Sequence, residues 1–404
     1  MSATLVVVGN GMAAGRMLEH LFANAPDAYD VVLFGAEPRG NYNRILLSPL
    51  LAGLEKFEQI VIHDADWYAA RNVACRFGET VTKIDRAAKT VHSRNGKTPY
   101  DKLVIATGSA PFVVPVAGKE LQGVLAFRDL DDVNAMLAVA ERPGTKAVVI
   151  GGGLLGLEAA AALRARGMDV VVLHLMSHLM ELQLDSIAAR LLQKELEGRG
   201  IRIHCQAQTT AILGHKRAEA VLLDDGTIYP ADLVVMAAGI RPETRIAVDA
   251  RLQVERGIVV DAQMQTSDRD ILAIGECVQF ENACYGFVEP LYEMAGVAAK
   301  TLVGGEAEFR PVQTATNLKV SGVQVFSTGD FLGAVGSEQI LFSDPGIGVY
   351  KKLVLDRGRL TGAILYGDTA DGLWYLDLIR SGASVEGFRD DLIFGRALVE
   401  RLAA

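Results

Sequence analysis

A glycine-rich turn between a predicted strand and a predicted helix constrains the fold of this chain more than any other feature. Residues 146–174 read KAVVIGGGLLGLEAAAALRARGMDVVVLH, in which Gly151, Gly153 and Gly156 have the spacing GxGxxG. In a strand–turn–helix context, the first glycine permits a tight turn and the second lets the backbone approach a pyrophosphate. The third lets the helix pack closely on the strand. We therefore predict a βαβ unit that binds a dinucleotide, with its phosphates at the helix N-terminus.

A second copy of this pattern opens the chain. Gly9, Gly11 and Ala14 occupy the same three positions in TLVVVGNGMAAG, and a predicted strand over 30–34 is followed by Glu37. An acid at that place can accept hydrogen bonds from a ribose. Two such units predict two dinucleotides, a tightly held flavin and a diffusible nicotinamide nucleotide, because a hydride must pass between two carriers. The alternative is that one copy is a structural repeat without a ligand.

The ribose position of the 146–174 copy is occupied by His174. Histidine cannot accept from two ribose hydroxyls as a carboxylate does, so this copy departs from the NAD fingerprint. No arginine lies beside it to hold a 2′-phosphate. We predict NADH as the donor, with NADPH as the alternative.

Composition bounds the class of protein. The length of 404 residues predicts two to three domains, and 50% hydrophobic residues with 41 glycines suit an α/β protein. A net charge of −9 argues against nucleic acid as a partner. The four cysteines are scattered without a CxxC, so neither a disulfide framework nor a metal site is predicted. With no apolar run long enough for a bilayer and no signal peptide, we expect a cytoplasmic protein without membrane segments.

Local patterns predict the remaining elements. Helices are expected over 129–141, 183–199 and 292–303, and Asn95-Gly96 predicts a hairpin. Residues 57–100 are expected to alternate short strands with polar turns, and strand-like runs begin at 318. The predicted fold is α/β, with two Rossmann-like dinucleotide-binding domains and a C-terminal α+β domain.

Two charged residues each have two interpretations. Arg44 lies within NYNRILLSPLLA, either exposed on a helix face or near the flavin, where a cation favours the reduced, anionic form. Glu276 follows a predicted buried strand and Gly275. It can accept from a hydroxyl of the cofactor's sugar chain, or act as a helix N-terminal acid.

Five motifs in order resemble the FAD-dependent pyridine nucleotide oxidoreductases. They are GNGMAAG from Gly9, ATG from Ala106, GGGLLGLE from Gly151, AAGIRP from Ala237 and AIGEC from Ala273. The resemblance covers about residues 4–310 and implies FAD in the first copy and NAD(P)H in the second. It implies an FAD domain of 1–115 and 245–310, an NAD(P)H domain of 116–244 and a C-terminal interface domain of 311–404.

The matching motifs also imply site residues. Those implied for FAD are Gly9, Gly11, Met12, Ala13, Ala14, Glu37, Arg44, Ser48, Val81, Ala106, Thr107, Gly108, Gly275, Glu276, Glu289, Pro290 and Leu291. Those implied for NAD(P)H are Gly151, Gly153, Leu154, Leu155, Gly156, Glu158, His174, Ala238 and Gly239. Glu158 and Arg44 are the candidate catalytic residues. Glu158 is implied to lie near the nicotinamide–flavin contact; its alternative role is an acid in the first helical turn.

Finer motifs, including NYNRILLS and EPLYEMA, resemble the flavin part of assimilatory NAD(P)H nitrite reductases and the electron-transfer subunit of assimilatory nitrate reductases. This implies a reductase that passes electrons to a separate iron–sulfur, molybdenum or sirohaem partner. Because the chain stops at Ala404, we expect no nitrite-reducing site in it. The 311–404 domain either docks this partner or forms a homodimer.

Three other activities are known for proteins of similar layout or could use the same two cofactors. A ferredoxin or rubredoxin reductase and a slow FAD- and NADH-binding redox sensor stay as alternatives. Disulfide reductases, oxidases and peroxidases of similar layout need a cysteine near the flavin, and residues 41–51 contain none.

Overall fold

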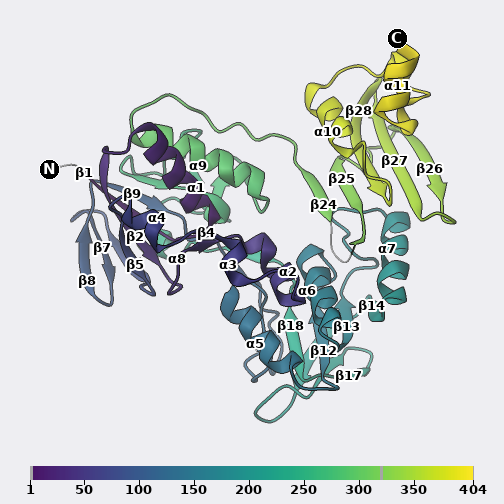
Figure 1. Ribbon diagram of the computed structural model, residues 1–404, viewed down its shortest axis with the longest axis horizontal. Helices are drawn as coiled ribbons and strands as arrows, with labels where there is room; N and C mark the ends of the chain where they lie inside the picture. Colours follow the sequence, from purple (N-terminus) through teal and green to yellow (C-terminus); the bar gives the residue numbers. More distant parts are fainter. Residues whose placement is uncertain (1–2, 319–321, 404) are drawn as a thin grey trace. The chain divides into compact units, whose positions relative to one another are not determined.

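The computed structural model of the protein describes residues 3–318 and 322–403 (Figure 1). The predicted strand-like run that begins at 318 includes residues 319–321, which lie outside the described residues. The chain forms two compact units. The first unit comprises Met1–Leu47, Glu55–Ala110 and Ile240–Pro311, and the second comprises Ser48–Leu54, Pro111–Gly239 and Val312–Ala404.

A parallel five-stranded sheet organises the first unit. Its order is β21-β9-β1-β2-β5, formed by β1 (Ala3–Val8), β2 (Tyr29–Gly35), β5 (Ala74–Phe77), β9 (Lys102–Ile105) and β21 (Ile271–Ala273). Helices α1 (Met12–Asn24) and α9 (Val288–Leu302) pack side by side (Figure 1). The central strands are buried almost throughout, as expected for a sheet covered on both faces.

Short elements complete the first unit. They are β3 (Asn41–Tyr42), the 3₁₀ turn Arg44–Leu46, α3 (Phe57–Ile60), β4 (Val61–His63), α4 (Ala65–Ala69), β6 (Val81–Asp85), β7 (Thr90–Ser93), β8 (Gly96–Pro99), β10 (Ser109–Pro111), β19 (Ile240–Pro242), α8 (Arg245–Asp249), β20 (Ile258–Val260), the 3₁₀ turn Gly275–Cys277, β22 (Val278–Phe280) and β23 (Ala283–Cys284). Strands β6, β7 and β8 form an antiparallel sheet, and β10 pairs with β19.

The second unit contains another parallel five-stranded sheet. Its order is β11-β18-β12-β13-β14, formed by β11 (Val124–Leu125), β12 (Lys146–Ile150), β13 (Asp169–His174), β14 (Ile201–Cys205) and β18 (Leu233–Met236). The helices of this part are α2 (Leu47–Ala52), α5 (Leu130–Ala140), α6 (Leu154–Ala165) and α7 (Ser186–Gly198). An antiparallel sheet of β15 (Thr209–Leu213), β16 (Ala220–Leu223) and β17 (Ile228–Pro230) follows. The βαβ unit predicted over 146–174 is therefore present as β12, α6 and β13.

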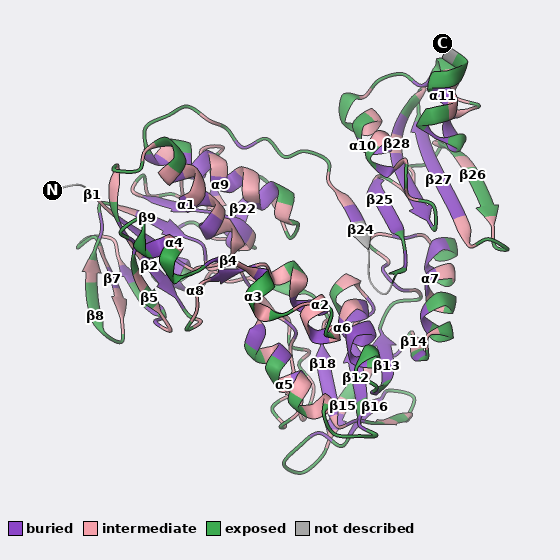
Figure 2. Cartoon of the chain, in the orientation of Figure 1, coloured by how far each residue is buried: buried purple, intermediate pink, exposed green. Residues whose placement is uncertain are grey.

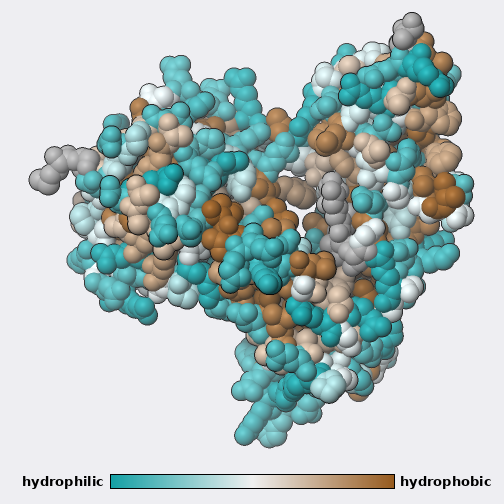
Figure 3. Space-filling model, in the orientation of Figure 1, coloured by the Kyte–Doolittle hydropathy of each residue, from teal (hydrophilic) through white to brown (hydrophobic). Residues whose placement is uncertain are grey.

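The predicted C-terminal α+β fold is also present in the second unit. An antiparallel sheet of order β24-β25-β28-β27-β26 is formed by β24 (Ala315–Leu318), β25 (Val325–Gly329), β26 (Glu338–Asp344), β27 (Val349–Asp356) and β28 (Arg359–Tyr366). With α10 (Gly372–Ser381) and residues 385–393 it builds a core of its own, seen as the buried faces of β25, β27 and β28 in Figure 2. Helix α11 (Arg396–Ala403) ends the described chain. Edge strand β26 exposes Leu341 and Phe342, in a part of the domain where Figure 3 shows apolar surface.

The C-terminal sheet contacts α7 within the same unit. The hydroxyl of Tyr350 donates to Asp185 Oδ2 at 2.7 Å, and the hydroxyl of Tyr366 donates to the Leu191 carbonyl at 3.2 Å. Asp185 is also the N-cap of α7, accepting from the Ala188 backbone N–H at 3.0 Å. The sheet is thus hydrogen-bonded to α7 at its N-cap, Asp185, and within the helix, at Leu191.

Several predicted boundaries were wrong. Helix α7 begins at Ser186 rather than 183, because Asp185 caps it. Helix α9 begins at Val288 rather than 292, and Pro290 fits its first turn, where no backbone donor is needed. Residues 57–100 contain the unpredicted short helices α3 and α4. The hairpin near Asn95 is confirmed, with its turn one residue earlier, since Ser93 pairs with Gly96.

Across residues 3–318 and 322–403, no helix combines the length and hydrophobicity needed to cross a bilayer. In the same residues no group of three acidic, histidine or cysteine side chains is placed to hold a metal ion.

Candidate dinucleotide sites

The glycine turn of the first unit connects β1 to α1. Gly9 has φ +110°, and a Cβ built there would lie 2.1 Å from the Ala106 carbonyl oxygen. Gly11, the N-cap of α1, has an ordinary φ of −83°. Apart from its neighbours in the chain, no atom of the described residues lies within 4 Å of a Cβ built there. No side chain of the described residues caps α1, and no acid lies in its first turn. Free helix N–H groups beside open space fit a phosphate group.

The glycine turn of the second unit has the same construction between β12 and α6. Gly151 has φ +125°, and its Cβ would lie 2.2 Å from the Ala237 carbonyl oxygen. Gly153 is the N-cap, with φ −81° and open space where a Cβ would point. A Cβ on Gly156 would lie 2.0 Å from the Gly151 carbonyl oxygen, so the helix and strand meet closely. Within the described part of the chain, helix α6 also has no side-chain cap, and its first turn contains no acid.

The other predicted residues of the first unit lie on several of its elements. Met12, Ala13 and Ala14 begin α1, and Ala106, Thr107 and Gly108 follow β9. Val81 begins β6 and is buried, whereas Glu289, Pro290 and Leu291 form the first turn of α9.

Glu37 and Arg44 form an ion pair just after β2. Arg44 Nη2 lies 2.5 Å from Glu37 Oε1, and the Tyr42 hydroxyl donates to Glu37 Oε2 at 2.7 Å. The Arg44 side chain is 27% exposed, and its guanidinium lies 5.2 Å from the centre of the Tyr42 ring. This geometry does not fit the interpretation of Arg44 as an exposed residue on a helix face. The short sequence separation of these residues could have suggested the pair.

Gly275 and Glu276 lie in the 3₁₀ turn after β21. Gly275 has φ +87°, and its Cβ position lies 3.3 Å from the Ala13 Cβ, next to the first turn of α1. Glu276 Oε2 accepts from the Ser109 hydroxyl at 2.7 Å. These residues therefore gather with the first glycine turn inside one unit. Cys277 is fully buried, and burial raises the pKa of its thiol.

Glu158 lies on α6 and is hydrogen-bonded to Ser48. The Ser48 hydroxyl donates to Glu158 Oε2 at 2.7 Å, within the second unit. Burial raises the pKa of the Glu158 carboxyl, and the hydrogen bond from Ser48 partly opposes that shift. Because α6 begins at Leu154, Glu158 is its fifth residue, which does not fit the interpretation as a first-turn acid. Ser48 was predicted to contact FAD; its contact with Glu158 was not foreseen.

The side chain of His174 is buried at the end of β13. Its Nδ1 accepts from the Gly152 backbone N–H at 3.0 Å, so the proton of a neutral ring is on Nε2. Nε2 lies 3.0 Å from Glu181 Oε2. Both ring nitrogens are therefore used by the protein, although the sequence placed His174 at a ribose. Glu181 was missed, because it lies in a segment without regular periodicity.

Leu154 and Leu155 open α6, and Ala238 and Gly239 follow β18. Gly239 has φ +112°, and its carbonyl accepts from the Phe112 N–H at 2.8 Å. The small residues after β18 thus mirror those after β9 in the first unit.

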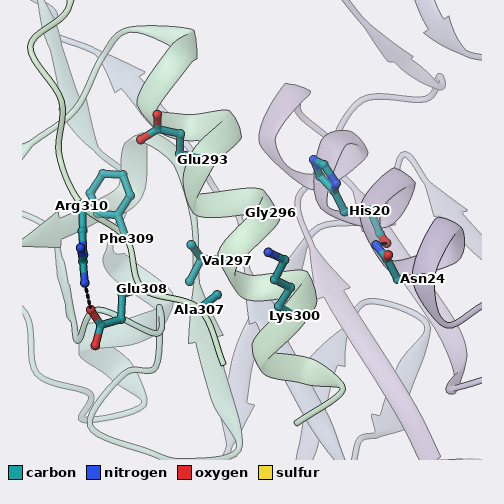
Figure 4. Close-up of a pocket in the computed structure, with 10 residues that line it drawn as sticks. All are labelled: His20, Asn24, Glu293, Gly296, Val297, Lys300, Ala307, Glu308, Phe309 and Arg310. Atoms are coloured by element: carbon teal, nitrogen blue, oxygen red, sulfur yellow. Dashed lines mark hydrogen bonds and ion pairs between the residues drawn. The ribbon is translucent and has the colours of Figure 1, made fainter. Parts of the chain in front are cut away.

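A hollow lies elsewhere on the first unit, between α1, α9 and residues 307–310 (Figure 4). His20, Asn24 and Lys300 line it, and an ion pair of 3.0 Å joins Arg310 to Glu308. None of the residues predicted to contact a cofactor is among its lining residues.

Comparison with known proteins identifies the family. Residues 3–301 match the model of the pyridine nucleotide-disulphide oxidoreductases, and residues 315–383 match the C-terminal domain of rubredoxin NAD+ reductase. The chain belongs to the pyridine nucleotide-disulphide oxidoreductase family. It is therefore an NAD(P)H-dependent oxidoreductase with sites for FAD and a nicotinamide nucleotide.

Three similar proteins span most of the chain. Nitrite reductase [NAD(P)H] of Bacillus subtilis is 46% identical over 383 residues, covering 94% of this chain and 48% of that protein. The assimilatory nitrate reductase electron transfer subunit of B. subtilis is 41% identical, covering 92% of this chain and 48% of that protein. The putidaredoxin reductase–putidaredoxin complex has a TM-score of 0.89 at 25% identity, covering 99% of this chain and 98% of that chain. The chain thus spans about half the length of these two curated relatives.

Proposed function

We propose that this chain moves a hydride from NADH to FAD and passes the electrons on to a separate protein acceptor in nitrate or nitrite assimilation. The observation that carries this proposal is that each unit contains a glycine turn followed by a helix for which the described residues provide no side-chain cap. Bound FAD would supply the conversion between two-electron and one-electron transfer. The resemblance to the B. subtilis nitrite and nitrate reductase proteins supports the metabolic setting.

In the first unit, the turn from Gly9 to Ala14 would hold the FAD pyrophosphate at the N-terminus of α1. Glu37 would accept from the ribose while its ion pair with Arg44 fixes the carboxylate. The residues after β9 (Ala106, Thr107 and Gly108), together with Gly275, Glu276 and the start of α9, would surround the rest of the cofactor. This assignment would fail if Glu276→Ala retained full, tightly bound flavin.

In the second unit, the turn from Gly151 to Gly156 would hold the nicotinamide nucleotide. Glu158 would orient the nicotinamide, with Ser48 fixing one oxygen of its carboxylate. NADH is proposed over NADPH because no arginine neighbours His174 in the sequence. We also propose that the FAD, NAD(P)H and C-terminal domains have the boundaries predicted from the sequence, at 115, 245 and 310.

The C-terminal domain would dock the electron acceptor. Its antiparallel sheet ends in the edge strand β26, which exposes Leu341 and Phe342. A homodimer through the same domain is the alternative, and light scattering with and without the acceptor separates the two. A second candidate acceptor is a rubredoxin-type protein, favoured by the match of residues 315–383 to the rubredoxin NAD+ reductase C-terminal domain.

Anaerobic stopped-flow absorbance tests the proposal. Purified protein is mixed with NADH or NADPH while the flavin band is followed. Fast bleaching by NADH supports the hydride step and the preferred donor, and equal bleaching by both would refute the preference. The reduced protein is then mixed with a nitrite reductase sirohaem protein, a nitrate reductase or a rubredoxin. Fast reoxidation by one of them identifies the acceptor, whereas a long-lived reduced complex with all would indicate a redox sensor.

A further inference from the structure

The end of β13 lacks the acid that a dinucleotide site ordinarily places there. His174 occupies that position, is 6% exposed, and uses both ring nitrogens within the protein. The ribose therefore has no acceptor on His174 itself. A site of this fold nevertheless needs an acceptor for the ribose hydroxyls at the same edge of the sheet.

The segment after β13 returns to the glycine turn. The Met180 backbone N–H donates to the Gly152 carbonyl at 3.0 Å, and Met180 has φ +51°. Leu179 packs so closely on Gly152 that a Cβ there would lie 2.6 Å from Leu179 Cδ2. Gly152 is thus bonded through its N–H to His174 and through its carbonyl to Met180. These two bonds bring the next residue, Glu181, to the turn that receives the nucleotide.

The carboxylate of Glu181 has one oxygen fixed and one available. Oε2 accepts from the Nε2–H of His174, since Nδ1 of that ring already accepts from Gly152. The Glu181 side chain is 28% exposed. Among the described residues, no group donates to its Oε1 and no lysine or arginine pairs with it. The result is a negatively charged acceptor that a buried ring holds in one orientation.

We infer that Glu181 is the acceptor for the adenosine ribose of the nicotinamide nucleotide, and that His174 is its positioning residue. This inference rests on the proposed nicotinamide nucleotide site of the second unit. A carboxylate accepts from a ribose 2′-hydroxyl and repels a 2′-phosphate. Glu181 therefore selects NADH over NADPH, although it lies seven residues beyond the usual position.

Isothermal titration calorimetry of the full, FAD-loaded protein tests this without turnover. The probes are ADP-ribose, its analogue lacking the adenosine 2′-hydroxyl, and 2′-phospho-ADP-ribose. Wild-type protein should prefer ADP-ribose to both others. Glu181→Gln should lower the affinity for ADP-ribose by about tenfold, because a hydrogen bond to a charged group is lost. The affinity for the deoxy analogue should stay nearly unchanged. The difference in affinity between ADP-ribose and 2′-phospho-ADP-ribose should become smaller.

Controls separate a direct role from a structural one. Glu219→Gln removes the same charge from an exposed acid of the same unit and should alter none of the three affinities. His174→Asn should reduce the difference between ADP-ribose and its deoxy analogue, because Glu181 loses its fixed orientation. The inference is wrong if Glu181→Gln lowers the affinities for ADP-ribose and for the deoxy analogue equally. It is also wrong if this variant changes neither affinity. If wild-type protein binds none of the probes, the nicotinamide nucleotide site itself is wrong.

Discussion

The turn between β1 and α1 and the turn between β12 and α6 have similar backbone conformations but differ in the charges around them. In both, a Cβ on the first glycine would strike a carbonyl oxygen, Ala106 in one unit and Ala237 in the other. Over residues 3–318 and 322–403, no side chain caps either helix. Near the first turn, however, Glu37 is paired with Arg44, whereas the His174 ring is the one partner of the Glu181 carboxylate among the described residues.

This difference teaches that the turn and the acid perform separate tasks. The backbone of the turn provides helix N–H groups for a pyrophosphate, whichever dinucleotide is bound. The acid determines how firmly and how selectively the ribose is held. A carboxylate paired with a cation suits a cofactor that stays in place, and a carboxylate without a cationic partner suits a nucleotide that must be chosen and exchanged.

The largest expected effects come from filling the open space in each turn. Gly11→Ala and Gly153→Ala place a methyl group where a phosphate would approach, at backbone angles that alanine adopts without strain. We expect Gly11→Ala to be purified without FAD. Gly153→Ala should keep FAD and lose about 10²-fold in the rate of flavin reduction at low NADH. Flavin content and stopped-flow absorbance measure both.

Gly9→Ala and Gly151→Ala are the matched controls, because they combine a positive φ with a clash against a carbonyl. They should impair folding itself, which circular dichroism detects. The comparison of the two turns breaks down if Gly153→Ala releases FAD, or if Gly11→Ala retains it.

A second test addresses Glu158. Glu158→Gln keeps the hydrogen bond to Ser48 but removes the charge, and we expect hydride transfer to slow by about tenfold. An unchanged rate in stopped-flow measurements would reject a catalytic role for this residue.

The same variant tests the raised pKa of the carboxyl. In the folded protein Glu158 holds its proton to a higher pH than in the unfolded chain. The free energy of unfolding of wild type, relative to Glu158→Gln, should therefore fall as pH rises from the ordinary carboxyl pKa through the raised one. Ser48→Ala should move this fall to higher pH, since the hydrogen bond lowers the pKa. Urea titrations across that pH range measure the difference, and a parallel pair of curves would contradict it.

A third test compares the two acids. Arg44→Met leaves Glu37 with the Tyr42 hydroxyl and with Arg39 at 3.8 Å. We expect the first unit to lose about 1–3 kcal/mol of stability, because a largely buried charge loses a close hydrogen bond. Glu181→Gln should cost less than about 1 kcal/mol, since the amide oxygen can still accept from His174. Chemical denaturation without added nucleotide measures both, and equal losses would remove the distinction between the acids.

The smallest effect is expected where the C-terminal sheet meets α7. Tyr350→Phe removes the hydrogen bond to Asp185 and should lower the free energy of unfolding by about 1 kcal/mol. NADH affinity should be unchanged, because Asp185 keeps its bond to the Ala188 N–H. A weaker NADH affinity in calorimetry would show that the sheet supports the nucleotide segment.

The sequence predicted those parts of the fold that depend on neighbouring residues. Both βαβ units were recognised because glycine spacing and β-branched runs are local signals, and the structure contains them as β1-α1-β2 and β12-α6-β13. The hairpin turn at Arg357-Gly358, which joins β27 to β28, also depends on neighbouring residues, and both residues have positive φ.

The sequence did not reveal contacts between distant or aperiodic segments. Ser48 and Glu158 are joined by a hydrogen bond across more than a hundred residues, so no motif links them. Glu181 lies in a segment whose course depends on the Met180–Gly152 bond, which no periodicity indicates. Such tertiary bonds decide which of several polar residues is available to a ligand.

The order of strands in the first unit has a consequence for how the protein is made. Strand β9 pairs with β1 on one side and with β21 on the other, joining Leu103 to Ile271. While a ribosome synthesises the intervening residues, the outer side of β9 has no strand to pair with. An unpaired edge of this kind invites pairing with other chains. Translation must therefore leave this sheet open until Ile271 emerges, and this interval is when a chaperone would be of most use to the nascent chain.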